Sequence, residues 1–170
     1  MAAVVVFTGL PGTGKSTLAE QVAVLLGAPA FSGDWLMGTL KPYGVLDDLD
    51  AGTYLEMYYN LLGTLMTRQL ALGQHAIIDC LITDEVGQRW REVAASHDAE
   101  LVIVECVCGD AGLHCRRLAG RRRDIPGWHE VDWDHVERMR IQYPPLKVAH
   151  MKVDSVRSVE DNLKLVLESL

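Results

Sequence analysis

The sequence predicts an α/β fold in which helices cover both faces of a parallel sheet. Short apolar runs alternate with longer segments of helical period, and no repeat, low-complexity tract or linker interrupts the alternation. A chain of 170 residues is long enough to bury one sizeable core. We therefore expect a single domain over residues 1–170.

Five short runs are predicted to form the strands of the sheet. Each is largely apolar, as expected of strands that are buried between helices. Their predicted limits are Val4–Thr8, Ala28–Ser32, His75–Asp79, Leu101–Val107 and His150–Val153.

The segments between these runs have helical period. The first, Lys15–Leu26, places Leu18, Val22 and Leu25 on one face. Thr83 and Ser158 are suited to cap the helices that follow them. One helix is expected to begin at Trp35 and another to follow Ser158. The remaining helices are expected to span Tyr54–Leu72, Asp84–Ser96, Asp110–Leu118 and Asp132–Ile141.

Charge and the chain ends restrict partners and location. The formal net charge of −7 argues against nucleic acid as the main partner. No apolar run reaches the roughly eighteen residues of a membrane span, and the N-terminus lacks the features of a signal peptide. We expect a cytoplasmic protein with reduced cysteines. A zinc site at His114 and Cys115 is a weaker alternative, because there is no paired CxxC.

The stretch GLPGTGKST lies directly between the first predicted strand and the first predicted helix. It fits GxxxxGK[ST], the P-loop or Walker A pattern, in which glycines let backbone N–H groups cradle phosphate oxygens at a helix start. A glycine-rich turn that binds nothing is the alternative. We expect nucleotide contacts from Gly9, Pro11, Gly12, Thr13, Gly14, Lys15, Ser16 and Thr17.

Two carboxylates follow predicted strands. Asp79 ends the strand in HAIIDC and, with the hydroxyl of Ser16, is suited to serve Mg²⁺. Asp34, in FSGDWLM, could accept the proton of an acceptor hydroxyl, and Gly33 would let that acceptor approach closely. The other possible role of Asp34 is to cap the helix expected from Trp35.

Three features favour phosphotransfer over hydrolysis or switching. No NKxD motif occurs in the chain, so the usual guanine-reading element of GTPases is missing. Cys80 occupies the place where motor-type ATPases usually carry a glutamate that activates water. The chain also has little room for a domain that could use the energy of hydrolysis.

The arginine-rich segment RRLAGRRRD is the predicted lid over the nucleotide. Arg117 and Arg121 share one face if the helix continues through both, and the Pro- and Gly-containing stretch DIPGWHE follows. We place the lid at about residues 117–131 and expect Lys15, Arg117 and Arg121 to stabilise the charge of the transferred phosphoryl group. A solvated helix end is the alternative.

In this order and spacing, the motifs resemble the small AAA-type P-loop kinases of the nucleoside-kinase-like group. The resemblance covers nearly the whole chain and rests on GLPGTGKST, the strand-end Asp34, AIIDC, QRWR and CRRLAGRRRD. The kinase domain of polynucleotide 5′-hydroxyl kinases and chloramphenicol phosphotransferase are most similar, and zeta toxins less so.

The resemblance implies a three-layer P-loop NTPase fold with a five-stranded parallel sheet in the order 2-3-1-4-5. It also implies transfer of the γ-phosphoryl group of ATP to a hydroxyl, with Asp34 as general base and Arg117 and Arg121 as lid arginines. The adenine would lie near Asp154 and Ser155. Met37 stands where the polynucleotide kinases carry an arginine, which argues against a nucleic-acid 5′ end as acceptor.

The predicted acceptor side carries the aromatic residues Trp35, Tyr43, Tyr54 and Tyr58. The acids at 47, 48 and 50 would suit a cationic or polyhydroxylated small molecule. Core packing and a solvated loop are the alternative interpretations. The sequence thus predicts an ATP- and Mg²⁺-dependent kinase acting on an antibiotic- or nucleoside-like small molecule. Its rivals are a 5′-hydroxyl polynucleotide kinase and a non-catalytic nucleotide-binding regulatory module.

Overall fold

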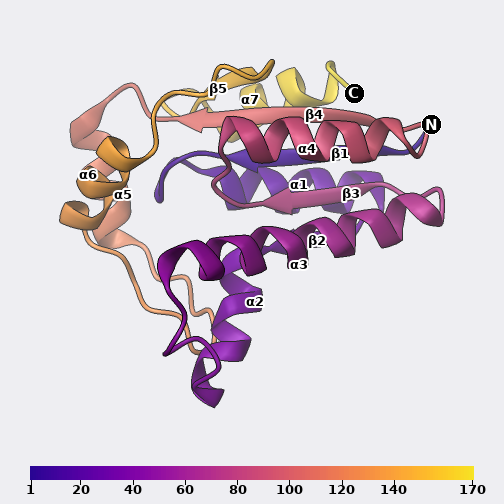
Figure 1. Cartoon of the computed structure of the whole chain (residues 1–170). Coiled ribbons are helices and arrows are strands. Elements are labelled where there is room, and N and C mark those ends of the chain that lie inside the picture. Colours follow the sequence, from indigo (N-terminus) through magenta and orange to yellow (C-terminus); the bar gives the residue numbers. More distant parts are fainter.

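The computed structural model describes residues 1–170 and has the α/β architecture shown in Figure 1. All strands run parallel, in the order β2-β3-β1-β4-β5. The fold class and strand order are therefore confirmed, and every strand lies within two residues of its predicted limits. The strands are β1 (Ala3–Thr8), β2 (Ala30–Ser32), β3 (Ala76–Asp79), β4 (Glu100–Val107) and β5 (Met151–Asp154).

Two pairs of helices sandwich the sheet (Figure 1). Helices α1 (Lys15–Leu26) and α7 (Val159–Leu167) pack on one face, against Phe7 among others. Helices α3 (Ala51–Ala71) and α4 (Asp84–Ala95) pack on the other, where Trp90 is almost fully buried. Both faces of the strands are covered, which explains their apolar composition. None of the helices has the length and apolar character that crossing a membrane requires.

Side-chain caps fix where the helices begin. Asp50 accepts hydrogen bonds from two backbone N–H groups of the next turn, at 2.9 and 3.0 Å. For this reason α3 begins at Ala51, before the predicted start at Tyr54. Thr83 and Ser158 each accept a backbone N–H of the following turn, at 3.3 and 3.1 Å, which confirms both predicted caps.

The remaining elements extend beyond the carboxyl ends of the strands, at the left and bottom of Figure 1. They are α2 (Gly33–Leu40), the 3₁₀ turn η1 (Lys41–Tyr43), α5 (Ala111–Gly120) and α6 (Trp133–Gln142). The loop between α5 and α6, residues 121–132, is called the lid below. It lies on α2 in direct backbone contact, because a Cβ on Gly38 would overlap the carbonyl oxygen of Pro126 and one on Gly127 would overlap that of Gly38.

Two local expectations at this edge are wrong. Helix α5 ends at Gly120 and Arg121 is extended, with φ −86° and ψ 147°, so Arg121 does not continue the helical face of Arg117. Helix α2 begins at Gly33 with Ser32 as its N-cap residue, so Asp34 lies inside the first turn and does not cap the helix.

Candidate active site

Glycines shape the loop between β1 and α1. Gly9, Gly12 and Gly14 have φ values of 138°, 86° and 86°, a region that side chains with a Cβ rarely adopt. A Cβ on Gly9 would also overlap the backbone oxygen of Cys106 on β4. Helix α1 begins at Lys15 without a side-chain cap, so its first N–H groups are free to bind an anion. The loop therefore fits a bound phosphate.

A buried histidine supports this loop from behind. The Nε2 atom of His114, on α5, lies 2.8 Å from the carbonyl oxygen of Pro11, and since a carbonyl only accepts, Nε2 is the donor. The ring meets Trp133 edge-on, with centroids 5.0 Å apart, and lies against Gly12. His114 thus ties α5 to the P-loop. No group of three or more candidate metal ligands surrounds it, so the zinc alternative has no support.

Two cavities lie along the carboxyl edge of the sheet. The larger has a volume of about 1020 Å³ and the smaller about 270 Å³. Lys15, Asp79 and Arg123 line both, so the cavities adjoin at these three residues. Of the predicted nucleotide contacts, Gly12, Thr13, Gly14, Lys15, Ser16 and Thr17 line the larger cavity, and Gly9, Pro11 and again Lys15 line the smaller.

Lys15 and Asp79 face each other where the cavities meet. Their side chains are nearly buried, and Nζ lies 4.0 Å from Oδ1. That carboxylate oxygen is buried and has no hydrogen-bond partner, a costly state that a bound group would relieve. The Ser16 hydroxyl lines the same cavity. Hard oxygen donors of this kind are what Mg²⁺ prefers together with phosphate oxygens and water, so the residues present fit the metal.

Arginines form the opposite wall of the larger cavity. Arg117, Arg121, Arg122 and Arg123 all line it, and Nη1 of Arg117 donates to the backbone oxygen of Ser155 at 2.7 Å. Nε and Nη2 of Arg121 are buried without a partner. Burial, and after it the nearby Arg123, lowers the pKa of Arg121. A guanidinium in this state is one that an anion would stabilise, as the phosphates of a nucleotide would.

The two positions expected near the adenine behave differently. Ser155 lines the larger cavity. The carboxylate of Asp154 instead accepts backbone N–H groups of Val156 and Gly109, at 2.9 and 3.1 Å, and these two hydrogen bonds lower the pKa of Asp154. Asp154 therefore joins the loop after β5 to the loop after β4.

Asp34 lies in the first turn of α2 and lines the smaller cavity. Its Oδ2 forms an ion pair with Nη2 of Arg123 at 2.5 Å. Because Arg123 lines both cavities, Asp34 stands beside the junction where Lys15 and Asp79 also lie.

The four predicted acceptor residues lie in three different places. Tyr54 and Tyr58, on α3, line the smaller cavity, Trp35 lines the larger, and Tyr43 is 78% exposed and lines neither. Burial raises the pKa of Tyr54 to about 12 and that of Tyr58 well above its ordinary value, so both hydroxyls are neutral. A Cβ on Gly33 would overlap the Tyr58 hydroxyl. Gly33 therefore makes room for Tyr58, and the expectation that it admits the acceptor is wrong.

The acids expected at the acceptor are not part of the cavity. Asp47 and Asp48 are exposed in the turns before α3, and Asp50 caps that helix. None of the three lines the smaller cavity. The composition of this loop therefore gives no support to a cationic acceptor.

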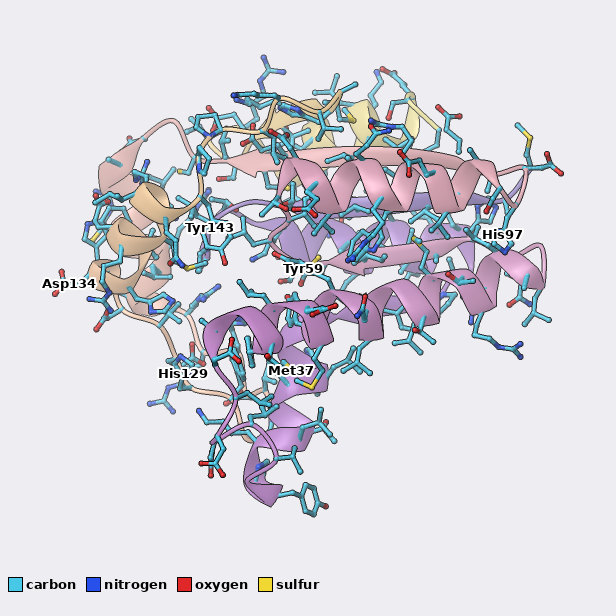
Figure 2. The ribbon with its side chains drawn as sticks, viewed as in Figure 1. Met37, Tyr59, His97, His129, Asp134 and Tyr143 are labelled. Carbon is cyan, nitrogen blue, oxygen red and sulfur yellow. The ribbon has the colours of Figure 1, made fainter.

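Residues of the lid and α6 complete the smaller cavity, and sequence reasoning missed them. His129 and Val131 come from the lid, and His135, Met139 and Tyr143 from α6 and its end. Figure 2 shows Tyr143 on the side of α6 that faces Tyr59 of α3. The spacing of four from His135 to Met139 to Tyr143 places them on one helical face and was the available signal.

The fold of the chain is that of the small P-loop kinases. Three solved structures share the fold. A gluconokinase from Sinorhizobium meliloti is 17% identical with a TM-score of 0.72, over 98% of this chain and 90% of that one. A sugar kinase from a Janibacter species is 18% identical with a TM-score of 0.70, over 99% and 94%. An APS kinase from Mycobacterium tuberculosis is 21% identical with a TM-score of 0.59, over 98% and 95%.

The chain belongs to the family described as an AAA domain, whose model matches residues 4–146. This match covers the P-loop, Asp34, Asp79 and the whole lid. No curated protein sequence matches the chain.

Proposed function

We propose that the protein is an ATP- and Mg²⁺-dependent phosphotransferase that moves the γ-phosphoryl group of ATP to a hydroxyl of a small molecule. One observation carries the proposal: the cavity lined by P-loop residues and a second, smaller cavity adjoin at Lys15, Asp79 and Arg123, and Asp34 lines the smaller one. A donor in one cavity and an alcohol in the other would meet there.

Each residue then has a role that its position supports. The P-loop amides and Lys15 bind the phosphates, and Arg117 and Arg121 stabilise their charge from the lid side. Asp34 accepts the proton of the attacking hydroxyl, and its ion pair with Arg123 holds the carboxylate in place. Mg²⁺, when bound through Ser16 and Asp79, supplies Lewis-acid stabilisation of the phosphate oxygens.

Cys80 supports transfer over hydrolysis. It follows Asp79, lines the smaller cavity and is nearly buried. Burial raises the pKa of its thiol well above the ordinary value, so this position offers a neutral thiol in place of a carboxylate that could activate water. The absence of a carboxylate at this position favours an alcohol over water as the nucleophile.

The size of the smaller cavity and the position of Met37 support a small acceptor. A volume of about 270 Å³ lies just below the roughly 300–1,000 Å³ usual for pockets that hold drug-sized ligands. Met37 is fully buried in α2, so it cannot contact a nucleic-acid phosphate. An antibiotic- or nucleoside-like acceptor and a cytoplasmic location stay predictions, and the volume favours the smaller members of the acceptor class.

A screen of hydroxylated metabolites and antibiotics for ATP-dependent gain of one phosphate by mass spectrometry tests the proposal. Asp34→Asn should lower the rate with the best acceptor by about 10²–10⁴-fold while ATP affinity stays unchanged. Asp47→Asn, an exposed acid outside both cavities, is the matched control. Short 5′-hydroxyl oligonucleotides are included in the screen, and their phosphorylation would support the polynucleotide kinase alternative. If the protein is instead a non-catalytic regulatory module, the Asp34→Asn variant should keep the full activity of the protein in cells.

A further inference from the structure

A basic group of side chains lies on the lid side of the smaller cavity. His129 of the lid and His135 of α6 line it, with ring centroids 6.4 Å apart. Nζ of Lys41, from η1, lies 3.4 Å from Nδ1 of His129 and 5.6 Å from the centre of the Trp128 ring. Figure 2 shows His129 on the lid, toward α2. Lys41, His129 and His135 are called the basic subsite below.

The contact with Lys41 determines which nitrogen of His129 carries the proton. An ammonium group only donates hydrogen bonds, so Nδ1 of His129 must accept. In the neutral ring the proton is then on Nε2, which has no protein acceptor. The ring of His135 likewise has no hydrogen-bond partner, and only its backbone N–H is engaged, with Asp132. Both imidazoles can therefore donate to a ligand.

The basic subsite has no negative partner of its own. The two carboxylates of the cavity are already paired, Asp34 with Arg123 and Asp79 with Lys15. None of the ion pairs in the molecule includes a residue of the basic subsite.

The nearby acids do not supply the missing charge. A carboxylate oxygen of Glu130 accepts the backbone N–H of Arg123 at 2.8 Å. Asp134 points away from the lid in Figure 2. Burial first, and then Lys41 and His135, lowers the pKa of His129, while Asp34 only partly opposes them. The surroundings of His129 are thus positive and would be stabilised by an anion.

We propose that the acceptor is a small hydroxy acid whose carboxylate binds to the basic subsite while its hydroxyl lies beside Asp34. The inference rests on the proposed function and adds the class of its substrate. Two imidazole N–H groups give a carboxylate charge-assisted hydrogen bonds, which are stronger than neutral ones, and the ammonium of Lys41 beside His129 adds positive charge. Tyr54, Tyr58 and Met139 line the same cavity, and their aromatic and apolar surfaces suit a short carbon chain.

Matched pairs of an acid and its neutral alcohol test this inference. The pairs are glycerate with glycerol, gluconate with glucitol, and 4-hydroxybutyrate with 1,4-butanediol. Binding is measured by calorimetry at constant ionic strength with Mg²⁺ and a non-hydrolysable ATP analogue present, so that the P-loop is filled and cannot bind the acid. At least one acid should bind about 10- to 100-fold more tightly than its alcohol.

Variants assign the preference to the basic subsite. In the double variant His129→Gln/His135→Gln, affinity for the acid should fall to that for the alcohol, with unchanged affinity for the ATP analogue and unchanged melting temperature. His97→Gln, at the far end of the sheet in Figure 2, should keep the preference. Lys41→Met should weaken acid binding in the same direction, and it serves as the second test if the double variant fails to fold.

Two results would overturn the inference: no acid binds better than its alcohol, or the preference survives in both the double variant and Lys41→Met. Phosphate transfer to neutral alcohols without any acid preference would overturn it and leave the proposed function intact. An acid preference that depends on the basic subsite supports the inference about binding. If no probe or screened alcohol is then phosphorylated, the proposed function fails separately.

Discussion

The two cavities are built in different ways. One continuous stretch, residues 12–17 of the P-loop and the start of α1, lines the larger cavity and depends on the glycine conformations of the loop. The smaller cavity is made mostly of side chains from α2, α3, the lid and α6, which are far apart in the sequence. The nucleotide side is therefore sensitive to any added Cβ. Side chains of the smaller cavity can change without disturbing the backbone that lines the larger one.

The largest effect is expected from Gly9→Ala. The residue has φ 138° and its Cβ would overlap a backbone oxygen of β4, so the loop must move. ATP with Mg²⁺ should no longer raise the melting temperature, and transfer should be lost. Gly27→Ala is the matched control, because Gly27 also has a positive φ, 59°, but nothing lies within 4 Å of its Cβ. It should cost about 1–2 kcal/mol and keep ATP binding. Normal ATP binding by Gly9→Ala would show that the loop conformation is not required.

Arg121→Met should separate stability from activity on the nucleotide side. Removing a guanidinium with two buried, unpartnered nitrogens should leave the melting temperature of the nucleotide-free protein unchanged or raise it. The rate of transfer should fall by about 10²–10³-fold, since a group that stabilises phosphoryl charge is lost. Arg116→Met, at an exposed position of α5, is the control in both assays. A full rate in Arg121→Met would remove this residue from the site.

Gly33→Ala tests the packing of the acceptor side. The added methyl group overlaps the Tyr58 hydroxyl and should lower the free energy of unfolding by about 1–3 kcal/mol in urea. In a Tyr58→Leu background the same change should cost much less, giving a clear coupling in a double-mutant cycle. ATP affinity should be unchanged in all variants. If the two substitutions change the free energy of unfolding in a strictly additive way, the missing Cβ of Gly33 is not what makes room for Tyr58.

The smallest effect concerns Asp154, whose pKa is lowered by backbone hydrogen bonds from Val156 and Gly109. Since the folded pKa lies below the unfolded value, the stabilisation is present above the ordinary Asp pKa of 3.8 and is lost as pH falls through the folded value. The stability difference between wild type and Asp154→Asn, measured by urea unfolding, should therefore shrink as pH is lowered from about 6 to about 3. Asp47→Asn is the exposed control. A difference independent of pH would contradict the assignment.

The contrast between the cavities also explains what could be predicted from the sequence. The P-loop pattern is local, and parallel strands bring their carboxyl ends to one edge, so Lys15, Ser16, Asp34 and Asp79 could be located before the structure was known. Helix α5 ends at Gly120, within two residues of its predicted end at Leu118, but the extended conformation of Arg121 that follows could not be read from the local sequence.

The acceptor cavity depends on long-range packing that a single sequence does not specify. Tyr54 and Tyr143 are almost ninety residues apart and still line the same space. The acidic composition of residues 41–63 did not indicate what lines the cavity, since its acids face solvent and the lid brings histidines instead. Aromatic positions on α3 were predictable as a set, but their division between cavity and surface was not.

The close backbone approach of Gly38 and Gly127 has a consequence for redesign. Any side chain at either position would act as a wedge and hold the loop that carries Arg123 and His129 away from α2. Under the proposed function, serine or alanine there would open the smaller cavity to bulkier alcohols and leave the P-loop, residues 9–17, unchanged. Neither glycine lines the larger or the smaller cavity, so such a substitution would change the space for the acceptor without altering a residue of either site.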